Sequence, residues 1–257
     1  MSSVAEADTE GIGVRVPDNA VARVSAVLGC FDVDAERLGV CEIARRSGLP
    51  KSTASRLIAD MVRHGLLERH EGVIGLGARL FELGQYVTWK RALRDVALPL
   101  MADLRSATRQ TVHLAVMDGT EVLYVEIIRG AAGPAMPSRV GGRLPAHASA
   151  VGKAMLAYSP RRLVEETVAA GMTPIGPRTL TSPRILMQQL AAVREEGVAF
   201  EREESGRGVA CVGSPILDAD GRPIAAISVS GWSGLMKLDR MAPAVRTAAL
   251  TAGRLLA

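Results

Sequence analysis

Basic and hydroxyl side chains between residues 45 and 70 are spaced so that they would contact phosphates and the edges of bases. Residues 45–69 contain six Arg or Lys and two Asp or Glu, a net charge of +4 that equals the formal charge of the whole 257-residue chain. Long cations of this kind bind phosphate, and small hydroxyls reach base edges in a groove. The candidate nucleic-acid contacts are Arg45, Arg46, Lys51, Ser52, Thr53, Ser55, Arg56, Arg69 and His70.

A helix-turn-helix would position these side chains. Residues 40–47 predict a first helix that Gly48 ends, and its two arginines at the C-terminal end suit the helix dipole. Residues 50–64 predict a second helix that begins with Pro50 and is followed by Gly65. Its first turns are the part that would enter the major groove of double-stranded DNA. Its apolar face, at three-and-four spacing, is Ala54, Leu57, Ile58, Met61 and Val62.

A hairpin and a further helix complete the predicted unit. Residues 66–69 and 73–76 predict short strands joined by a turn at His70-Glu71-Gly72, which would form a wing beside the DNA backbone. Residues 19–31 have apolar side chains at helical spacing and predict a helix that packs against the helix-turn-helix. Residues 32–39 predict a polar connection. A helical hairpin with solvated charges is the alternative, but motif order, helix lengths, turn and wing agree with one another.

Composition narrows the class of protein. Hydrophobic residues make up 48% of the chain and charged residues 23%, and no apolar run approaches the eighteen or so residues of a membrane helix. The three cysteines are far apart and lack metal-ligand spacing, which predicts reduced thiols in a cytoplasmic protein without a metal. No Gly-rich phosphate loop or nucleotide fingerprint is present, so we expect no cofactor.

The rest of the chain predicts an α+β protein with a second, larger domain. We expect a disordered arm over 1–14, a DNA-binding domain over 15–77, a linker helix over 78–94, and a ligand-binding domain over 95–257. The first connecting helix is predicted over 78–91; whether it forms a dimer interface or packs within its own chain stays open. The predicted strands are 111–117, 121–128, 198–202, 209–217 and 223–230, and the predicted helices are 96–107, 160–170, 183–196 and 240–256.

The segment LPAHASAVGKAMLA, residues 144–157, is a loop that runs into a helix crowded with small residues. Small side chains leave backbone N–H groups approachable, and the start of a helix favours an anion, so a carboxylate would bind near residues 149–152. Close helix packing also requires Ala and Gly. The sequence leaves these two interpretations equally open.

Four motifs in order resemble those of one family. EIARRSGLPKSTASRLIADMVRHGLLER occurs in the first half, and LPAHASAVGKAMLA, REEGVAFEREESGRGVACVGSPILDADG and AAISVSG follow in the second. The chain resembles the IclR (isocitrate lyase regulator) transcriptional regulators over nearly all of its length. The resemblance implies a winged helix-turn-helix, a linker helix and a C-terminal GAF-like effector-binding domain. It also implies a homodimer or a dimer of dimers on promoter DNA.

The same resemblance implies where a small organic acid or aromatic catabolite would bind. Members that bind the smallest acids have Gly-Ala in the loop and Asp before the acidic run, where this chain has Ala150-Val151 and Glu201. The bulkier Val151 and the longer Glu201 change the volume and charge of the site, so the identity of the ligand does not carry over. The implied effector contacts are Ala150, Val151, Glu201, Cys211, Ser228 and Ser230.

Cys211 and His147 also allow other interpretations. Cys211 sits in an apolar strand and, apart from the resemblance, is more often a buried small hydrophobe than a ligand contact. His147 and Cys211 have neither an orienting third group nor an oxyanion hole, so we expect no catalytic residues. The alternative function is a small-molecule-binding protein or enzyme whose N-terminal module mediates association. The favoured one is a regulator in which an effector biases the placement of paired DNA readers.

Overall fold

The computed structural model describes residues 19–32, 35–131, 133–134 and 136–256. The predicted N-terminal arm over 1–14 lies outside the described residues. The chain divides into two compact units, one ending at Val87 and the other beginning at Thr88. Each unit has its own hydrophobic core.

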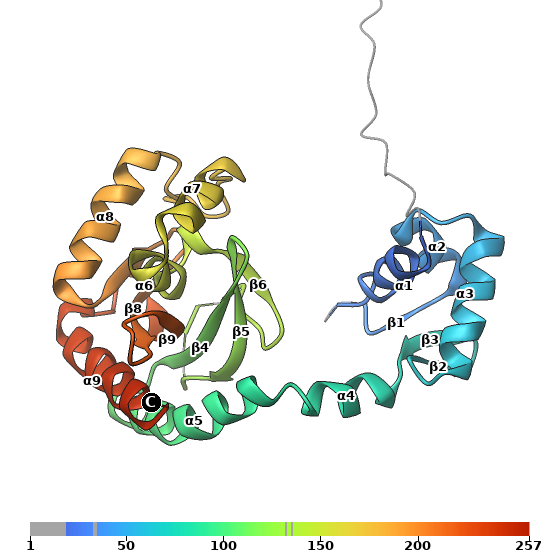
Figure 1. Cartoon of the computed structure of the whole chain (residues 1–257), viewed down its shortest axis with the longest axis horizontal. Coiled ribbons are helices and arrows are strands. Elements are labelled where there is room, and N and C mark those ends of the chain that lie inside the picture. The colour runs from blue at the N-terminus through green and yellow to red at the C-terminus, as the bar shows by residue number, and fades with distance from the viewer. Residues whose placement is uncertain (1–18, 33–34, 132, 135, 257) are drawn as a thin grey trace, which may run out of the picture. The chain divides into compact units, whose positions relative to one another are not determined.

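The described residues between 19 and 76 of the N-terminal unit form three helices, as predicted, and a small antiparallel sheet (Figure 1). Its core is formed by apolar side chains from every helix, including the fully buried Val27, Ile43 and Ile58. The sheet has the strand order β1-β3-β2. The elements are α1 (Ala20–Leu28), β1 (Arg37–Leu38), α2 (Val40–Ser47), α3 (Lys51–Arg63), β2 (Leu67–His70) and β3 (Val73–Leu76).

Three details of this unit differ from the sequence prediction. Helix α1 ends at Leu28, three residues earlier than expected, and the Asn19 side chain caps its start by accepting from the Ala22 amide. Pro50 precedes α3 as its cap residue instead of beginning it. The polar connection over 32–39 contains β1, which pairs with β3. A two-residue strand is too short to show an alternating pattern, so the sequence did not reveal it.

The wing forms close to where it was predicted. Strand β2 begins one residue later than expected, and β3 has the predicted bounds. His70 pairs with Val73, so the turn consists of Glu71 and Gly72 alone. Both turn residues have positive φ, 48° and 87°, as a two-residue turn that matches the twist of a hairpin requires. The hairpin therefore has a defined register.

The connecting region is two helices, so the predicted single helix over 78–91 was wrong. Helix α4 (Ala78–Gln85) ends before Tyr86, and α5 (Thr88–Thr108) includes the whole of the separately predicted helix over 96–107. No Pro or Gly occupies positions 86 and 87, so the residue types there do not signal the break.

The C-terminal unit is a six-stranded antiparallel sheet with the order β6-β5-β4-β9-β8-β7 and helices on both faces (Figure 1). Side chains of α5 and α9 pack on one face, and those of α6, α7 and α8 belong to the core on the other. The strands are β4 (Thr111–Asp118), β5 (Glu121–Ile128), β6 (Arg143–Pro145), β7 (Ala199–Arg202), β8 (Val209–Leu217) and β9 (Pro223–Trp232). The helices are η1 (Ala146–Ala148), α6 (Ala150–Tyr158), α7 (Arg161–Ala169), α8 (Pro183–Glu196) and α9 (Leu238–Leu256).

The α+β fold with an N-terminal winged helix-turn-helix is confirmed. Most element boundaries lie within two residues of the predicted ones, and β8 and α8 have the predicted bounds. The sheet also has a short edge strand, β6, which lies outside the predicted strands. Among the described residues, no helix is long and apolar enough to cross a membrane.

Candidate nucleic-acid interface and ligand pocket

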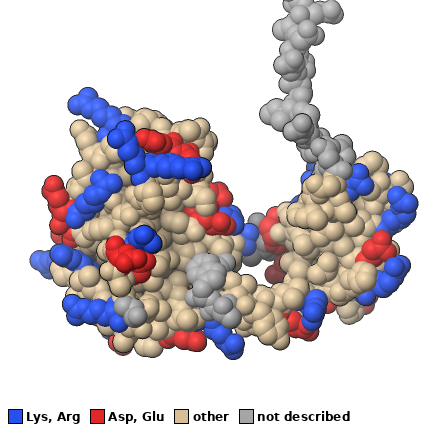
Figure 2. Space-filling view, viewed as in Figure 1, with Lys and Arg blue, Asp and Glu red and all other residues tan. Residues whose placement is uncertain are grey.

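The start of α3 presents the predicted hydroxyl and basic side chains to solvent. Lys51, Ser52, Ser55 and Arg56 are exposed, while Thr53 is half-buried. The opposite face of the helix is buried in the core, as its apolar periodicity predicted. Figure 2 shows Lys and Arg side chains along the edge of the N-terminal unit where α3 lies. The polar face of α3 is therefore available to an external partner.

The basic side chains of this surface differ in whether they form an ion pair within the protein. Within the described part of the chain, Lys51, Arg56 and Arg69 form no ion pair, whereas Arg63 pairs with Asp60. Arg69 and His70 are exposed at the end of β2, next to the turn of the wing. Unpaired guanidinium and ammonium groups keep their charge for a phosphate, so these positions fit the predicted role best.

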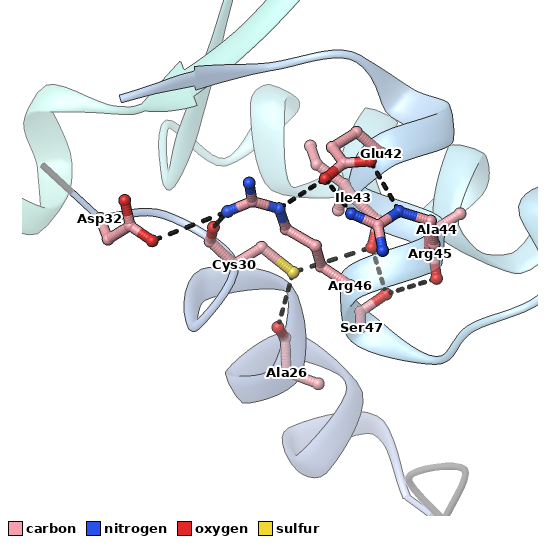
Figure 3. A network of polar contacts seen from close by, with 9 residues as sticks. All are labelled: Ala26, Cys30, Asp32, Glu42, Ile43, Ala44, Arg45, Arg46 and Ser47. Carbon is pink, nitrogen blue, oxygen red and sulfur yellow. Dashed lines mark hydrogen bonds and ion pairs between the residues drawn. The ribbon is translucent and has the colours of Figure 1, made fainter. Parts of the chain in front are cut away.

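The two arginines of α2 are held by a neighbouring carboxylate (Figure 3). Arg45 donates to both oxygens of Glu42, at 2.9 and 2.6 Å, and Arg46 donates to Glu42 at 2.7 Å. These hydrogen bonds lower the pKa of Glu42 to about 2. Arg46 also donates to the Cys30 carbonyl at 3.2 Å and lies 3.6 Å from the Asp32 carboxylate. Arg46 thus joins α2 to the segment after α1, a structural role that the sequence did not suggest.

Buried polar contacts complete the link between α1 and α2. The Cys30 thiol lies 3.2 Å from the Ala26 carbonyl and 3.7 Å from that of Ile43 (Figure 3). The Ser47 hydroxyl donates to the Ile43 carbonyl at 2.7 Å. Burial raises the pKa of the Cys30 thiol, which keeps it protonated and able to donate. Of these contacts, the one between the Cys30 thiol and the Ile43 carbonyl connects α2 to the segment after α1, whereas the Ser47 hydrogen bond lies within α2.

In the C-terminal unit, one small cavity is lined by all six of the predicted effector residues: Ala150, Val151, Glu201, Cys211, Ser228 and Ser230. Its volume is about 20 Å³, which is about the space that one water molecule needs. The wall also contains residues that the sequence analysis did not single out: His113, Tyr124, Met136, Pro137, Ser138, Leu144, Ser149, Ser205 and Val209. His147 is not among the lining residues.

The pairing of strands explains why residues distant in the sequence meet at this cavity. Glu201 lies opposite Cys211, and Cys211 lies opposite Ser230. In the same way Ser228 lies opposite His113. Successive side chains of a strand point to opposite faces, so Ser228 and Ser230 share the face that α6 covers. The two serines could be placed on one face from the sequence, but their partners depended on the strand order.

The start of α6 supplies both packing and a wall of the cavity. A Cβ atom at position 152 would lie 2.2 Å from the Ala146 carbonyl oxygen, so only glycine permits this approach. The preceding Ala150 and Val151 line the cavity. The Ser149 hydroxyl caps the helix by accepting from the Gly152 amide at 3.1 Å. Gly152 therefore serves close packing, whereas Ala150 and Val151 form a wall of the cavity.

A chain of polar groups runs along one wall of the cavity. The Cys211 thiol lies 2.7 Å from the Ser230 hydroxyl, and that hydroxyl lies 3.3 Å from His113 Nδ1. The other ring nitrogen of His113 lies 2.8 Å from the Ser138 hydroxyl. Burial, with a smaller contribution from Arg129, lowers the pKa of His113 to about 3. The imidazole is therefore neutral at physiological pH and supplies no counter-charge to an anion.

Glu201 is the charged group of the wall and is fully buried. Its Oε1 accepts from the Glu204 amide, the Ser205 amide and the Ser205 hydroxyl, each at 3.0 Å. Its Oε2 is buried without a hydrogen-bond partner. One half of the carboxylate thus holds the loop after β7, and the other half has an unused acceptor.

A buried ion pair lies behind this wall. Lys153 of α6 is fully buried, and its ammonium donates to both carboxylate oxygens of Glu204, at 2.6 and 2.7 Å. It also donates to the Gln189 side chain of α8 at 2.7 Å. The pair therefore joins α6, α8 and the loop that Glu201 holds.

Among the described residues, no group of three or more His, Cys, Asp or Glu is arranged to hold a metal ion.

Comparison with protein families matches residues 20–71 to the IclR helix-turn-helix domain and residues 85–254 to the bacterial transcriptional regulator IclR C-terminal domain. The chain belongs to the IclR family. It is a transcriptional regulator with a helix-turn-helix and an effector-binding domain, and not an enzyme.

Individual relatives agree with this assignment. The regulator XynR of Escherichia coli is 35% identical over 82% of this chain and 84% of its own length. The transcriptional repressor IclR of Escherichia coli is 34% identical over 79% of this chain and 76% of its own. A crystal structure of an IclR homologue from Microbacterium hydrocarbonoxydans, complexed with 4-hydroxybenzoate, has a TM-score of 0.85 and 33% identity. The structural alignment covers 92% of this chain and 98% of the homologue's chain.

Removing the buried cation is expected to destabilise the C-terminal unit. Lys153→Met should lower the free energy of unfolding by about 3–5 kcal/mol, because the Glu204 carboxylate would stay buried without its partner. The double variant Lys153→Met/Glu204→Leu should recover most of this loss, since it buries no unpaired charge. Urea denaturation measures both. The exposed Lys237→Met is the matched control, with an expected change below about 0.5 kcal/mol. Equal losses in the single and double variants would contradict this account of the pair.

Proposed function

We propose that this protein binds a promoter operator through the start of α3 and the wing, and that a small molecule in the cavity modulates that binding. The effector is a small organic acid or aromatic catabolite. The observation that carries the proposal is that all six motif-derived positions line one small cavity. The complex of a solved relative with 4-hydroxybenzoate supports an aromatic acid as a candidate. A DNA partner also supports a cytoplasmic location.

The proposed division of labour follows the two units. The DNA-binding domain is residues 15–77, the linker is 78–94 and the effector-binding domain is 95–257. In the DNA-binding domain the base-reading candidates are Ser52, Ser55 and Arg56, which are exposed at the start of α3. Lys51 and Arg69 have charges free for phosphates. Arg45 and Arg46 would reach phosphate only while sharing their charge with Glu42.

A second copy of this chain is the proposed partner of α4. No residue of this helix is buried, and its exposed side chains include Leu83 and Phe81, the latter at 72% of its full area. The exposed Tyr86 directly follows the helix. Large exposed apolar groups on one short helix are typical of an interface. Because paired readers must be held at the spacing of two half-sites, we propose a homodimer or a dimer of dimers built on α4.

Replacing the guanidinium of Arg56 should weaken DNA binding. Arg56→Ala should weaken binding to an operator selected by the wild-type protein from random-sequence DNA by about tenfold to a hundredfold, the usual effect of losing a base contact. Fluorescence anisotropy at several salt concentrations measures the affinity. Arg162→Ala is the matched control, because it removes the same charge from an exposed position on α7. Unchanged affinity in Arg56→Ala would favour an N-terminal module that only mediates association.

Effector binding should be detected first as stabilisation and then as a change in operator affinity. A ligand at a hundred times its Kd adds about 2.7 kcal/mol to the free energy of unfolding, and therefore raises the Tm. A thermal-shift screen of small carboxylates, aromatic acids and sugar acids should contain at least one compound with this effect. The same compound should change operator affinity about 5-fold to 150-fold, the usual range of allosteric coupling. A compound that binds but leaves operator affinity unchanged would refute the coupling.

The dimer proposal is tested on α4. Phe81→Glu should weaken self-association about thirtyfold, because a buried aromatic contact of an interface contributes about 2 kcal/mol or more. Sedimentation equilibrium measures the association constant. Leu235→Glu introduces the same charge at an equally exposed apolar position of the other unit and should leave it unchanged. A wild-type protein that stays monomeric at micromolar concentration would contradict the proposal.

A further inference from the structure

A basic groove, separate from the small cavity, lies where the end of β7 meets the start of α9. Its volume is about 500 Å³, within the range of small-molecule sites. We infer that this groove binds a small organic polyanion, a molecule that carries two or more phosphate or carboxylate groups. The inference does not depend on the role proposed for the small cavity, because none of the residues that line the groove lines that cavity.

The groove is lined by basic side chains from separate segments of the chain. The four cations are Arg178 from the loop before α8, Arg202 at the end of β7, Lys237 directly before α9 and Arg240 in the first turn of α9. Two acids, Glu203 and Asp239, also line the groove, so the net charge of the lining is 4 − 2 = +2. A concave surface with an excess of positive charge concentrates anions.

Most of these cations have no carboxylate partner in the protein. Among the described residues, Arg202, Lys237 and Arg240 form no ion pair, although all three are exposed. The Arg202 guanidinium lies 5.3 Å from the centroid of the Phe200 ring, a contact that positions the side chain without neutralising its charge. Their N–H groups are therefore available for charge-assisted hydrogen bonds to phosphate or carboxylate oxygens.

Two of the cations lie where the helix dipole disfavours positive charge. Lys237 and Arg240 are at the N-terminus of α9, a helix of 19 residues, and Asp239 in the first turn offsets only one of the two charges. The same helix end would stabilise a bound anion. A polyanion in the groove would therefore interact favourably with both the cations and the dipole. Cations at this position serve anion binding and do not serve the stability of the helix.

Backbone hydrogen bonds hold the walls of the groove together. The Gly208 amide donates to the Glu203 carboxylate at 2.8 Å, and the Gly208 carbonyl accepts from the Ser233 amide at 2.8 Å. The loop after β7 is thus joined to the turn before α9. The Arg178 amide donates to the Glu203 carbonyl at 3.0 Å, which joins the loop before α8 to the same wall. A groove that is formed before the ligand binds lowers the entropic cost of binding.

Titration of the full-length protein with small anions tests the site. Citrate and fructose 1,6-bisphosphate are the polyanionic probes, and acetate and fructose are their monoanionic and neutral counterparts. Calorimetry at low salt should give a Kd of about 1 mM or lower for at least one polyanion. Its counterpart should bind about tenfold or more weakly, because it makes fewer charge-assisted hydrogen bonds. High salt should weaken the polyanion, since the cations are exposed.

Substitutions in the groove test whether the polyanion binds there. Arg202→Gln and Arg240→Gln should each weaken its binding about tenfold, because each removes a charge-assisted contact. Arg184→Gln is the matched control, since it removes the same charge from an exposed position on α8 outside the groove. Its Kd should be unchanged. Arg240→Gln should not lower the Tm of the ligand-free protein, because the lost charge opposes the helix dipole.

The outcomes separate this groove from other places where an anion could bind. No binding of either polyanion, or equal binding of each polyanion and its counterpart, would overturn the inference. An equal loss of affinity in Arg184→Gln would also overturn it, because the probe would then respond to the total charge of the protein. Arg56→Ala should retain polyanion binding. Loss of binding in Arg56→Ala but not in Arg240→Gln would assign the probe to the DNA-binding surface and refute the site.

Discussion

The buried contact between Lys153 and Glu204 is the constraint on which the ligand-binding half of the molecule depends. A buried charge is tolerated only when it is paired and hydrogen-bonded, and Lys153 meets this requirement with Glu204 and Gln189. Because the three groups come from α6, α8 and the loop after β7, pairing them sets the position of all three. The same loop donates its amides to Glu201. The cavity is thus walled by elements that one charge network holds in place.

That network also explains why the cavity wall has a carboxylate with no cation beside it. The ammonium neutralises Glu204, so the Glu201 carboxylate is left with hydrogen bonds but without a cation of its own. A neutral His113 and several hydroxyls complete the wall. If the cavity holds the effector, as proposed, such a surface would select it by the placement of donors and acceptors more than by net charge. The basic surface of the N-terminal unit differs in this respect, because its exposed Lys51, Arg56 and Arg69 form no ion pair among the described residues.

The reader and the pocket were predictable from the sequence to different degrees. The helix-turn-helix, the wing and their exposed residues follow from local periodicity, caps and turns, which act over a few residues. The break between α4 and α5 and the strand β1 were missed, because neither has a local signal. The structural contacts of Arg46 were also missed, since Cys30 and Asp32 approach it only after α1 packs on α2.

The sequence by itself determined the order of the elements, the apolar and polar faces of each, and the family motifs that named Ala150, Val151, Glu201, Cys211, Ser228 and Ser230. Only the tertiary structure decided that these six residues meet at one cavity and that His113, Tyr124 and Ser138 join them. The physical reason is that strand pairing and helix packing bring together residues far apart in the chain. Whether an oxygen of Glu201 is satisfied depends on those long-range neighbours, which periodicity does not encode.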